Sequence, residues 1–398
     1  MLTLIEGGRV YAPEPCGMQS VLLADGHVGT VGDIDRGALE RLGAEYQVID
    51  ATGCIVAPAL IDPHVHLLGG SGETGFSTQT PEFFVSELVQ NGVTTVVGTL
   101  GVDTTMKTMA GLLAKVKALK EQGLNAFCWT GGYDVPPHSI LQNVREDILF
   151  IEEVIGAGEV AISDTRALPF EPRELARVAV HAHIGGMLAQ KAGLVHVHVG
   201  ESDRRLAPLR TVLDEYDVEA DWFYPTHIER SEKLVGEAIH LSQTGGMPFD
   251  VDVVERDLYR WLRFWRDHGG PPHLLTASSD ASINRPAVMD QLRDCVLNHG
   301  FALEQVLPLA TKNTARILKL REKGELRKGC AGDILLLEEG SLEIVHVLSH
   351  GKFVVRDGRV VEREAWLEES DREIRLQGGK AGQAGNEAAG DGHVALGP

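Results

Sequence analysis

Apolar runs alternate with amphipathic, helix-like segments through the middle of the chain, from residue 55 to about residue 315. Each run has the length of a buried strand. The predicted strands are Ile55–Ile61, Val93–Gly98, Asn125–Thr130, Glu159–Ser163, Leu194–Val199, Phe223–Thr226, Pro248–Val253 and Leu274–Ala277, and the clearest helices are Met106–Glu121, Arg173–Lys191 and Val254–Asp267. Repeated strand–helix units of this kind predict an α/β fold, a (β/α)8 TIM-like barrel. The seventh strand could instead be a loop that crosses the barrel mouth.

The two ends of the chain have a different pattern of short strands and tight turns. Asp25-Gly26 and Asp357-Gly358 are both hairpin signals between apolar segments. We therefore expect residues 1–54 and residues 316–376 to pair in a small β-sandwich beside a barrel formed by residues 55–315. The last segment, residues 377–398, is rich in Gly and Ala and predicts a flexible tail.

Composition narrows the class of protein. The net charge of −20 argues against a nucleic-acid partner, and no apolar run is long enough to predict a membrane span. The start of the chain lacks the basic region of a signal peptide. Five scattered cysteines without a C-x-x-C pair argue against a cysteine zinc cluster and suit a reducing compartment. These features predict a cytoplasmic protein with a small-molecule substrate.

Polar side chains gather where the predicted strands end. His64 and His66 follow the first strand, and because strand residues alternate faces they should point the same way. Glu159 opens the fourth strand, and the others end in His196-Val197-His198, in His227 and in Asp280. Active sites of such barrels lie at the carboxyl ends of the strands. We therefore expect these side chains to converge.

Four histidines, a Glu and an Asp can hold two divalent metals with a bridging water between them. Nitrogen and carboxylate ligands suit Zn²⁺, with manganese, cobalt or iron as alternatives. Asp280 could take a proton from that water and pass it to a leaving nitrogen. Each residue has another interpretation: Asp280 could cap a helix, His227 could lie in a loop, and either His196 or His198 could point into the barrel. We favour His198 as the ligand.

Six motifs extend this pattern: APALIDPHVHLLGGSGETG, TGGYDVP, EVAISDTR, VHVHVGES, YPTHIER and ASSDASIN. With them the chain resembles the amidohydrolase superfamily, and within it the bacterial isoaspartyl (β-aspartyl) dipeptidases. The similarity covers nearly the whole chain except the tail. H-x-H alone is common to the superfamily, whereas GGSGETG, TGGYDVP and THIER are more specific.

The resemblance implies a two-zinc hydrolase that cleaves the isopeptide bond of β-aspartyl dipeptides with a metal-activated bridging hydroxide, and it implies a homo-oligomer. It makes His64, His66, His198 and His227 metal ligands and Asp280 both a ligand and the catalytic acid/base. Tyr133 would polarise the scissile carbonyl. Glu73 would bind the substrate ammonium, and Arg166 and Arg230 would bind carboxylates, for which the planar guanidinium is suited.

The chain departs from the family at four positions. Glu159 stands where the family has a carboxylated lysine that bridges the metals; we expect Glu159 to bridge them, and the alternatives are a single-metal site or a Glu159 outside the coordination sphere. Val102 replaces a threonine near the substrate, Ser71 interrupts a glycine run, and Asn284 replaces a serine that holds a carboxylate. Ser71 and Asn284 stay candidate substrate-binding residues. Another amidohydrolase activity (a cyclic amide hydrolase, an N-acyl-amino-acid deacylase or a deaminase) and a non-catalytic barrel are the alternatives.

Overall fold

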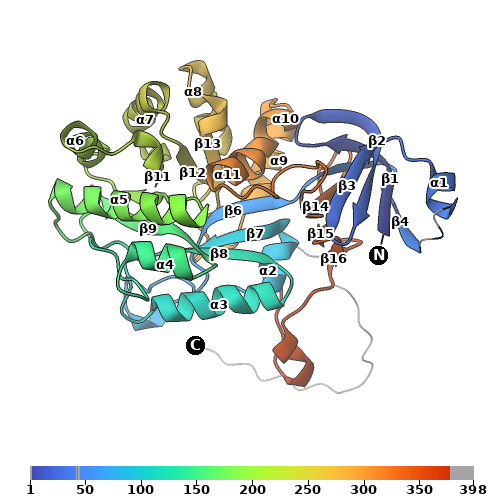
Figure 1. Ribbon diagram of the computed structural model, residues 1–398, viewed down its shortest axis with the longest axis horizontal. Helices are drawn as coiled ribbons and strands as arrows, with labels where there is room; N and C mark the ends of the chain where they lie inside the picture. The colour runs from blue at the N-terminus through green and yellow to red at the C-terminus, as the bar shows by residue number, and fades with distance from the viewer. Residues whose placement is uncertain (1, 42, 44, 377–398) are drawn as a thin grey trace, which may run out of the picture.

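The computed structural model describes residues 2–41, 43 and 45–376, and it places a parallel α/β region beside a mixed β-sheet (Figure 1). The parallel strands are β6 (Leu60–Val65), β7 (Val93–Gly98), β8 (Asn125–Thr130), β9 (Val154–Ile162), β10 (Val195–Val199), β11 (Phe223–Thr226), β12 (Phe249–Asp252) and β13 (Leu275–Ser278). Strands β6 to β11 form one six-stranded sheet in chain order, and β12 and β13 form a separate parallel pair.

Short contacts connect the pair to the sheet on both sides. On one side Val65 and Ala281 form a parallel bridge, and the His66 amide donates to the Ala281 carbonyl at 2.9 Å. On the other side the Tyr224 hydroxyl and the Thr226 hydroxyl of β11 donate to Asp250 of β12, at 3.2 and 2.9 Å. The strands therefore form a TIM-like barrel in which backbone pairing is continuous over six strands.

Two predicted strands differ from the structure. The run Ile55–Ile61 is not one strand, because β5 (Cys54–Pro58) pairs with β1 (Leu2–Tyr11) and β14 (Ile334–Glu338) in the mixed sheet, and β6 starts afresh at Leu60. The fourth barrel strand begins at Val154, so Glu159 lies within β9 and does not open it. The uncertain seventh strand is confirmed as β12.

Helices cover the outside of the parallel strands (Figure 1). They are α2 (Val85–Gln90), α3 (Met109–Glu121), α4 (Val144–Phe150), α5 (Pro172–Ala189), α6 (Ala207–Glu215), α7 (Glu232–Gly245), α8 (Leu258–Asp267), α9 (Val288–His299), α10 (Leu303–Val306) and α11 (Lys312–Ile317). In α3, Met109, Leu112, Val116 and Leu119 are buried at helical spacing, and the Thr108 side chain caps its start. The three predicted helices are therefore α3, α5 and α8.

Both chain ends contribute to the mixed sheet. Its remaining strands are β2 (Pro15–Ala24), β3 (His27–Gly32), β4 (Tyr46–Asp50), β15 (Ile344–Ser349), β16 (Lys352–Arg356) and β17 (Arg359–Val360), with the helix α1 (Arg36–Arg41) before β4. The order is β17-β16-β15-β14-β5-β1-β2-β3, with β4 beside β1. The expected pairing of the two ends is confirmed, but hydrogen bonds join them in one nine-stranded sheet where we expected a sandwich.

The mixed sheet curls so that its edge strand β3 approaches the segment before β14. The Val28 amide of β3 donates to the Cys330 carbonyl at 2.7 Å, and Val10, Leu23, Ile334 and Leu348 share one buried cluster. Both predicted hairpin turns are present: Asp25 and Gly26 have φ of 49° and 74°, and Asp357 and Gly358 have φ of 51° and 71°. These left-handed values match the short hairpin turns that Asp-Gly favours.

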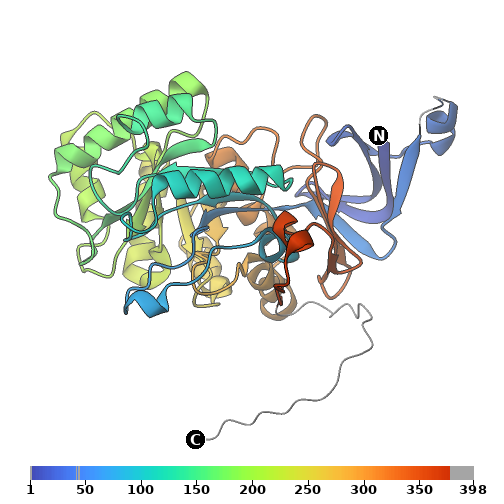
Figure 2. The same cartoon turned by 90° about the horizontal axis from the view of Figure 1, so that it is seen from below.

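After β17 the chain returns to the barrel (Figure 2). The amide and the hydroxyl of Ser86, in α2, donate to the Glu364 carboxylate at 3.0 and 2.8 Å. The ring centres of Trp366 and Phe84 are 6.0 Å apart. The predicted tail, residues 377–398, lies outside the described residues. Among the described residues, no helix has the length and apolar character needed to cross a membrane. All five cysteines are free.

Candidate metal centre and active site

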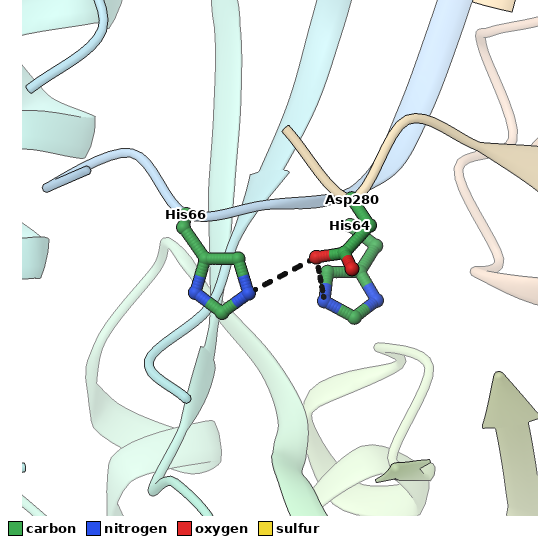
Figure 3. Close-up of side chains that lie close together, drawn as sticks. All are labelled: His64, His66 and Asp280. Atoms are coloured by element: carbon green, nitrogen blue, oxygen red, sulfur yellow. Dashed lines mark ion pairs between the residues drawn. The ribbon is translucent and has the colours of Figure 1, made fainter. Parts of the chain in front are cut away.

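Two histidines and an aspartate meet at the end of β6. His64 is fully buried near the end of that strand, His66 follows it, and Asp280 comes two residues after β13. The Nε2 atoms of His64 and His66 lie 3.3 and 3.1 Å from the same oxygen, Oδ1 of Asp280 (Figure 3). The prediction that the two imidazoles point the same way is confirmed. The bridge between Val65 and Ala281 fixes the two chain segments that carry them.

Glu159 lies between two pairs of histidines. Its Oε1 is 3.5 Å from Nε2 of His66, and its Oε2 is 3.5 Å from Nε2 of His64. The same Oε2 is 3.4 Å from Nδ1 of His198 and 3.8 Å from Nε2 of His227. The carboxylate is buried. The structure therefore brings together the six residues that the sequence singles out as metal ligands.

A bulge in β9 turns Glu159 toward the barrel interior. Val195 pairs with Ala157 and Val197 with Val160, so Gly158 and Glu159 together oppose the single residue His196. Gly158 has φ of 143°, and a Cβ on it would lie 2.6 Å from the His196 carbonyl oxygen. Only glycine fits this close approach of two backbones. The bulge supplies the backbone approach that a side chain shorter than lysine requires.

The cluster fits divalent metal ions. His64, His66 and Asp280 offer ligand atoms within 4.8 Å of one another, and so do His64, Glu159 and His227. His64 Nε2 and Glu159 Oε2 are buried and have no hydrogen-bond partner in the described part of the chain. Buried polar atoms are rarely left unpaired. A metal ion bound at about 2.0–2.2 Å from nitrogen and carboxylate ligands would satisfy both atoms.

Three of the histidines have a second polar partner on the side away from Glu159. Nε2 of His198 lies 3.0 Å from Asp164, and Nδ1 of His227 lies 2.6 Å from Asp252. Nδ1 of His64 lies 3.1 Å from Nε2 of His196. Such partners fix the orientation and tautomer of metal-binding histidines. Each ring is thereby held with its other nitrogen facing the Glu159 carboxylate.

His196 points into the barrel and does not face Glu159. Its Nδ1 lies 2.9 Å from the Tyr224 carbonyl oxygen, and its ring stacks on Trp129 with 5.0 Å between ring centres. A carbonyl only accepts, so Nδ1 of His196 carries the proton and its Nε2 accepts from His64. The expectation that one of His196 and His198 stacks inside the barrel is confirmed for His196.

The predicted substrate-binding groups surround a cavity of about 360 Å³ that opens onto the cluster, here called the first cavity. Its lining includes Ser71, Glu73, Val102, Tyr133, Arg166 and Arg230 together with His66, Glu159, His198, His227 and Asp280. The Tyr133 hydroxyl lies 3.0 Å from Nδ1 of His198. Asn284 is exposed and is not among the lining residues, which include its neighbours Ser282 and Ile283. The structure does not bring Asn284 to the site.

Two groups expected to bind opposite charges of a substrate are paired with each other. The Arg166 guanidinium donates at 3.0 Å to both oxygens of Glu73 and at 2.8 Å to Asp164. It also lies over the Tyr133 ring, 5.3 Å from the ring centre. Arg230, in contrast, is 4.0 Å from its nearest carboxylate, Glu201.

Comparison with known proteins agrees with this geometry. Residues 55–361 match the amidohydrolase family. The chain belongs to this family. It is similar to the solved β-aspartyl dipeptidase of Fervidobacterium islandicum AW-1, with 36% identity and a TM-score of 0.86 over 90% of this chain and 98% of that one. The complex of that dipeptidase with β-Asp-Leu gives 35% identity and a TM-score of 0.83 over the same shares.

Curated relatives of this amidohydrolase carry other names. An adenine deaminase of Halalkalibacterium halodurans is 25% identical over 357 residues, which are 86% of this chain and 54% of the deaminase. An adenine deaminase of Rhizobium meliloti is 26% identical over 79% of this chain and 51% of its own length. The chain thus spans about half the length of these curated relatives.

Charge and burial act against each other in the amidohydrolase site. Burial alone would lower the pKa of His64, but Glu159 and Asp280 outweigh it and raise that pKa to about 9. Burial alone would raise the pKa of Glu159, but His64, His198 and His227 hold it well below the usual range. Burial, and then the Glu159 charge, raise the pKa of Tyr133 well above its usual value. Tyr133 therefore keeps its proton and can donate it in a hydrogen bond.

Sequence reasoning missed the acidic partners of the histidines. The side chains of Asp164 and Asp252 are only 5% and 7% exposed and lie against His198 and His227, and Glu229 lies beside Asp252 and His227. Asp252 is the last residue but one of the predicted seventh strand, Pro248–Val253, and Asp164 follows the predicted fourth, so both positions carried a usable signal. An aspartate at the carboxyl end of a barrel strand can be expected to face the site.

Proposed function

We propose that this amidohydrolase cleaves the isopeptide bond of β-aspartyl dipeptides, and that Glu159, together with the four histidines around it and Asp280, would hold two divalent metals. One observation carries the proposal. The first cavity joins the histidine–carboxylate cluster to Tyr133 and to an opposed pair of charges, Glu73 and Arg166. A free isoaspartyl end has an ammonium and a carboxylate, which match that pair. The 35% identity to a dipeptidase solved with β-Asp-Leu supports this choice of substrate.

The residues have distinct parts in the reaction. Divalent metals, when bound, supply an activated water and polarise the substrate carbonyl. Asp280, held beside His64 and His66, takes up a proton and delivers it to the leaving nitrogen. The Tyr133 phenol, which stays protonated, donates to the carbonyl oxygen as negative charge develops there.

Substrate binding exchanges one set of ion pairs for another. Arg166 is paired with Glu73 and Asp164 in this structure. The substrate ammonium would replace Arg166 as the partner of Glu73, and the substrate carboxylate would replace Glu73 as the partner of Arg166. One pair within the protein is replaced by two pairs with the substrate, so the buried end of the substrate does not leave either protein charge unpaired.

Deamination of a purine is the second candidate, because curated relatives are named adenine deaminases. The lining of the first cavity favours the dipeptide. Adenine is a neutral, flat ring and has no charged group to pair with Glu73, Arg166 or Arg230, which line that cavity. Zinc as the metal, a homo-oligomeric state and a cytoplasmic location stay predictions.

The test is hydrolysis of β-Asp-Leu by the purified protein before chelation, after chelation and after zinc is restored, with adenine assayed in parallel. We expect release of aspartate and leucine that stops with the chelator and returns with zinc. Asp280→Asn should abolish turnover and retain the fold, whereas Glu304→Gln, an exposed change on α10, should match the unmodified protein. Release of ammonia from adenine without cleavage of β-Asp-Leu would replace the proposal by the deaminase.

A further inference from the structure

A second cavity meets the first at the histidine–carboxylate cluster. It has a volume of about 810 Å³ and is lined mainly by the segments that follow β10, β11 and β12, including the first turns of α7 and α8. His227, Arg230 and Asp280 line both cavities. The two cavities are therefore adjacent, and these three side chains form their junction.

Only the first cavity contains the groups suited to the isoaspartyl end. Glu73 and Arg166 line it, and neither lines the second cavity. If that end occupies the first cavity, the scissile amide lies near Asp280, at the junction. The leaving amino acid then extends toward the second cavity, and Arg230, at the junction, is placed to bind its carboxylate.

The outer wall of the second cavity has carboxylates in excess. Glu201, Asp203, Glu255 and Asp257 line it. Arg205 lies 2.6 Å from Glu237, which is outside the lining, and 4.0 Å from Asp203. Arg260 lies 3.4 Å from Glu232, also outside the lining, and 4.0 Å from Asp257. Glu255 forms no ion pair with any described residue. Lys233 is the remaining cation of the wall, and its side chain is exposed.

An independent feature of the second cavity indicates a polar occupant. Glu229 lines it and is only 8% exposed, yet its Oε2 atom has no hydrogen-bond partner in the described part of the chain. The carboxyl lies beside Asp252 and His227. A buried polar atom without a hydrogen-bond partner costs free energy. A polar group that enters from the junction could supply that partner.

We propose that the second cavity receives the side chain of the leaving amino acid and prefers a cationic side chain, lysine or arginine, to an anionic one. The proposal rests on the proposed function. It adds a substrate class, because the isoaspartyl end alone does not determine which residue follows it. The larger volume of the second cavity also permits long leaving residues.

The test compares kcat/KM for β-Asp-Lys, β-Asp-Leu and β-Asp-Glu at low and high salt. In water, one carboxylate about 5 Å away favours a positive substrate charge about four-fold and disfavours a negative one by about the same factor. We therefore expect kcat/KM for β-Asp-Lys to exceed that for β-Asp-Glu at least about ten-fold at low salt. The preference should shrink as salt is added. Glu255→Lys should reduce the ratio, Glu255→Gln should reduce it less, and Glu304→Lys on α10 should leave it unchanged.

The outcomes separate the two proposals. Cleavage of β-Asp-Leu with equal rates for the Lys and Glu substrates would overturn the second-cavity proposal and leave the proposed function standing. A ratio that Glu255→Lys and Glu304→Lys lower equally would also overturn it, because the effect would then come from net charge. Failure to cleave all three dipeptides, by a protein with zinc bound, would overturn the proposed function and this inference with it. Glu255→Gln keeps the test valid if Glu255→Lys does not fold.

Discussion

The two pairs of histidines around Glu159 differ in what lies behind them. His198 and His227 each contact a buried carboxylate, Asp164 and Asp252. Behind His64 is another imidazole, His196, and no partner is found for the second nitrogen of His66 among the described residues. A carboxylate partner makes an imidazole more basic and a stronger ligand, whereas a neutral imidazole chiefly orients it. The outer partners of one pair are therefore charged, whereas the outer partner of His64 in the other pair is neutral.

This difference teaches that a metal centre of this kind can be asymmetric although its ligands are of the same type. The asymmetry comes from residues that would not touch a metal. Glu159 is common to both pairs, because its Oε2 faces His64, His198 and His227 and its Oε1 faces His66. Changes at Glu159 should therefore affect both pairs, and changes behind the histidines should affect one.

Removal of the shared carboxylate should have the largest effect. Glu159→Ala leaves four imidazoles and Asp280 around the cluster without the group between them, so we expect metal content to fall toward one per chain. Activity on β-Asp-Leu should fall at least about a thousand-fold, because loss of a group that faces all four histidines should cost more than the about 10- to 100-fold expected for loss of a carboxylate behind one histidine. Elemental analysis after gel filtration measures the first effect. An unchanged content of two metals would place Glu159 outside the coordination sphere.

Removal of one outer carboxylate should have the next largest effect and should act on one pair. Asp252→Asn keeps the size of the side chain but removes the charge that His227 contacts at 2.6 Å. We expect metal affinity to fall about 10- to 100-fold, with the fold retained. Competition with a chelator of known affinity gives the number. Equal loss from both bound metals would contradict the separation into pairs.

Replacement of the neutral partner should have a smaller effect. His196→Gln keeps a group that can accept from His64, although it loses the stacking on Trp129. We expect a loss of affinity below about 10-fold, and His196→Phe should cost more because it cannot accept. The order of the two variants is the readout, measured by metal titration. If phenylalanine is tolerated better than glutamine, His196 matters for packing and not for the tautomer of His64.

The sequence predicts the residues of this site better than the local backbone features and ion pairs that hold them in place. The barrel strands and six converging residues follow from apolar runs and the polar residues at their ends. The break between β5 and β6 does not, because Pro58, Ala59 and Leu60 continue one apolar run and both strands are buried. The bulge at Gly158 is also hidden, since a glycine in a strand permits a bulge without requiring one. The pairing of Glu73 with Arg166 joins loops far apart in the chain, and no local pattern reports it.

The pH titrations of His227 and His64 should also differ between the two pairs of histidines, and this is a smaller effect than the losses of metal affinity. In the metal-free protein the pKa of His227 is about 10 and that of His64 about 9, although burial opposes both increases. Because both exceed the usual value of about 6.5, the stability they add is complete below pH 6.5 and is lost as pH rises through 9 and 10. Imidazole signals in NMR should therefore titrate first for His64. The melting temperature of the metal-free protein should fall over this range, and zinc should remove the trend because bound imidazoles are already deprotonated.

Bicarbonate should have no effect on the activity that zinc restores. This prediction tests the position of Glu159 between the two pairs of histidines. A carboxylated lysine needs CO₂ to form, whereas Glu159 carries its carboxylate permanently. Within the described chain, no lysine lines the first cavity. We expect activity restored by zinc to be the same with and without bicarbonate. The matched variant is Glu159→Lys, in which any recovered metal binding should depend on bicarbonate. A bicarbonate requirement in the unmodified protein would mean that a lysine outside this cluster reaches the metals, and Glu159 would lose its place between the two pairs.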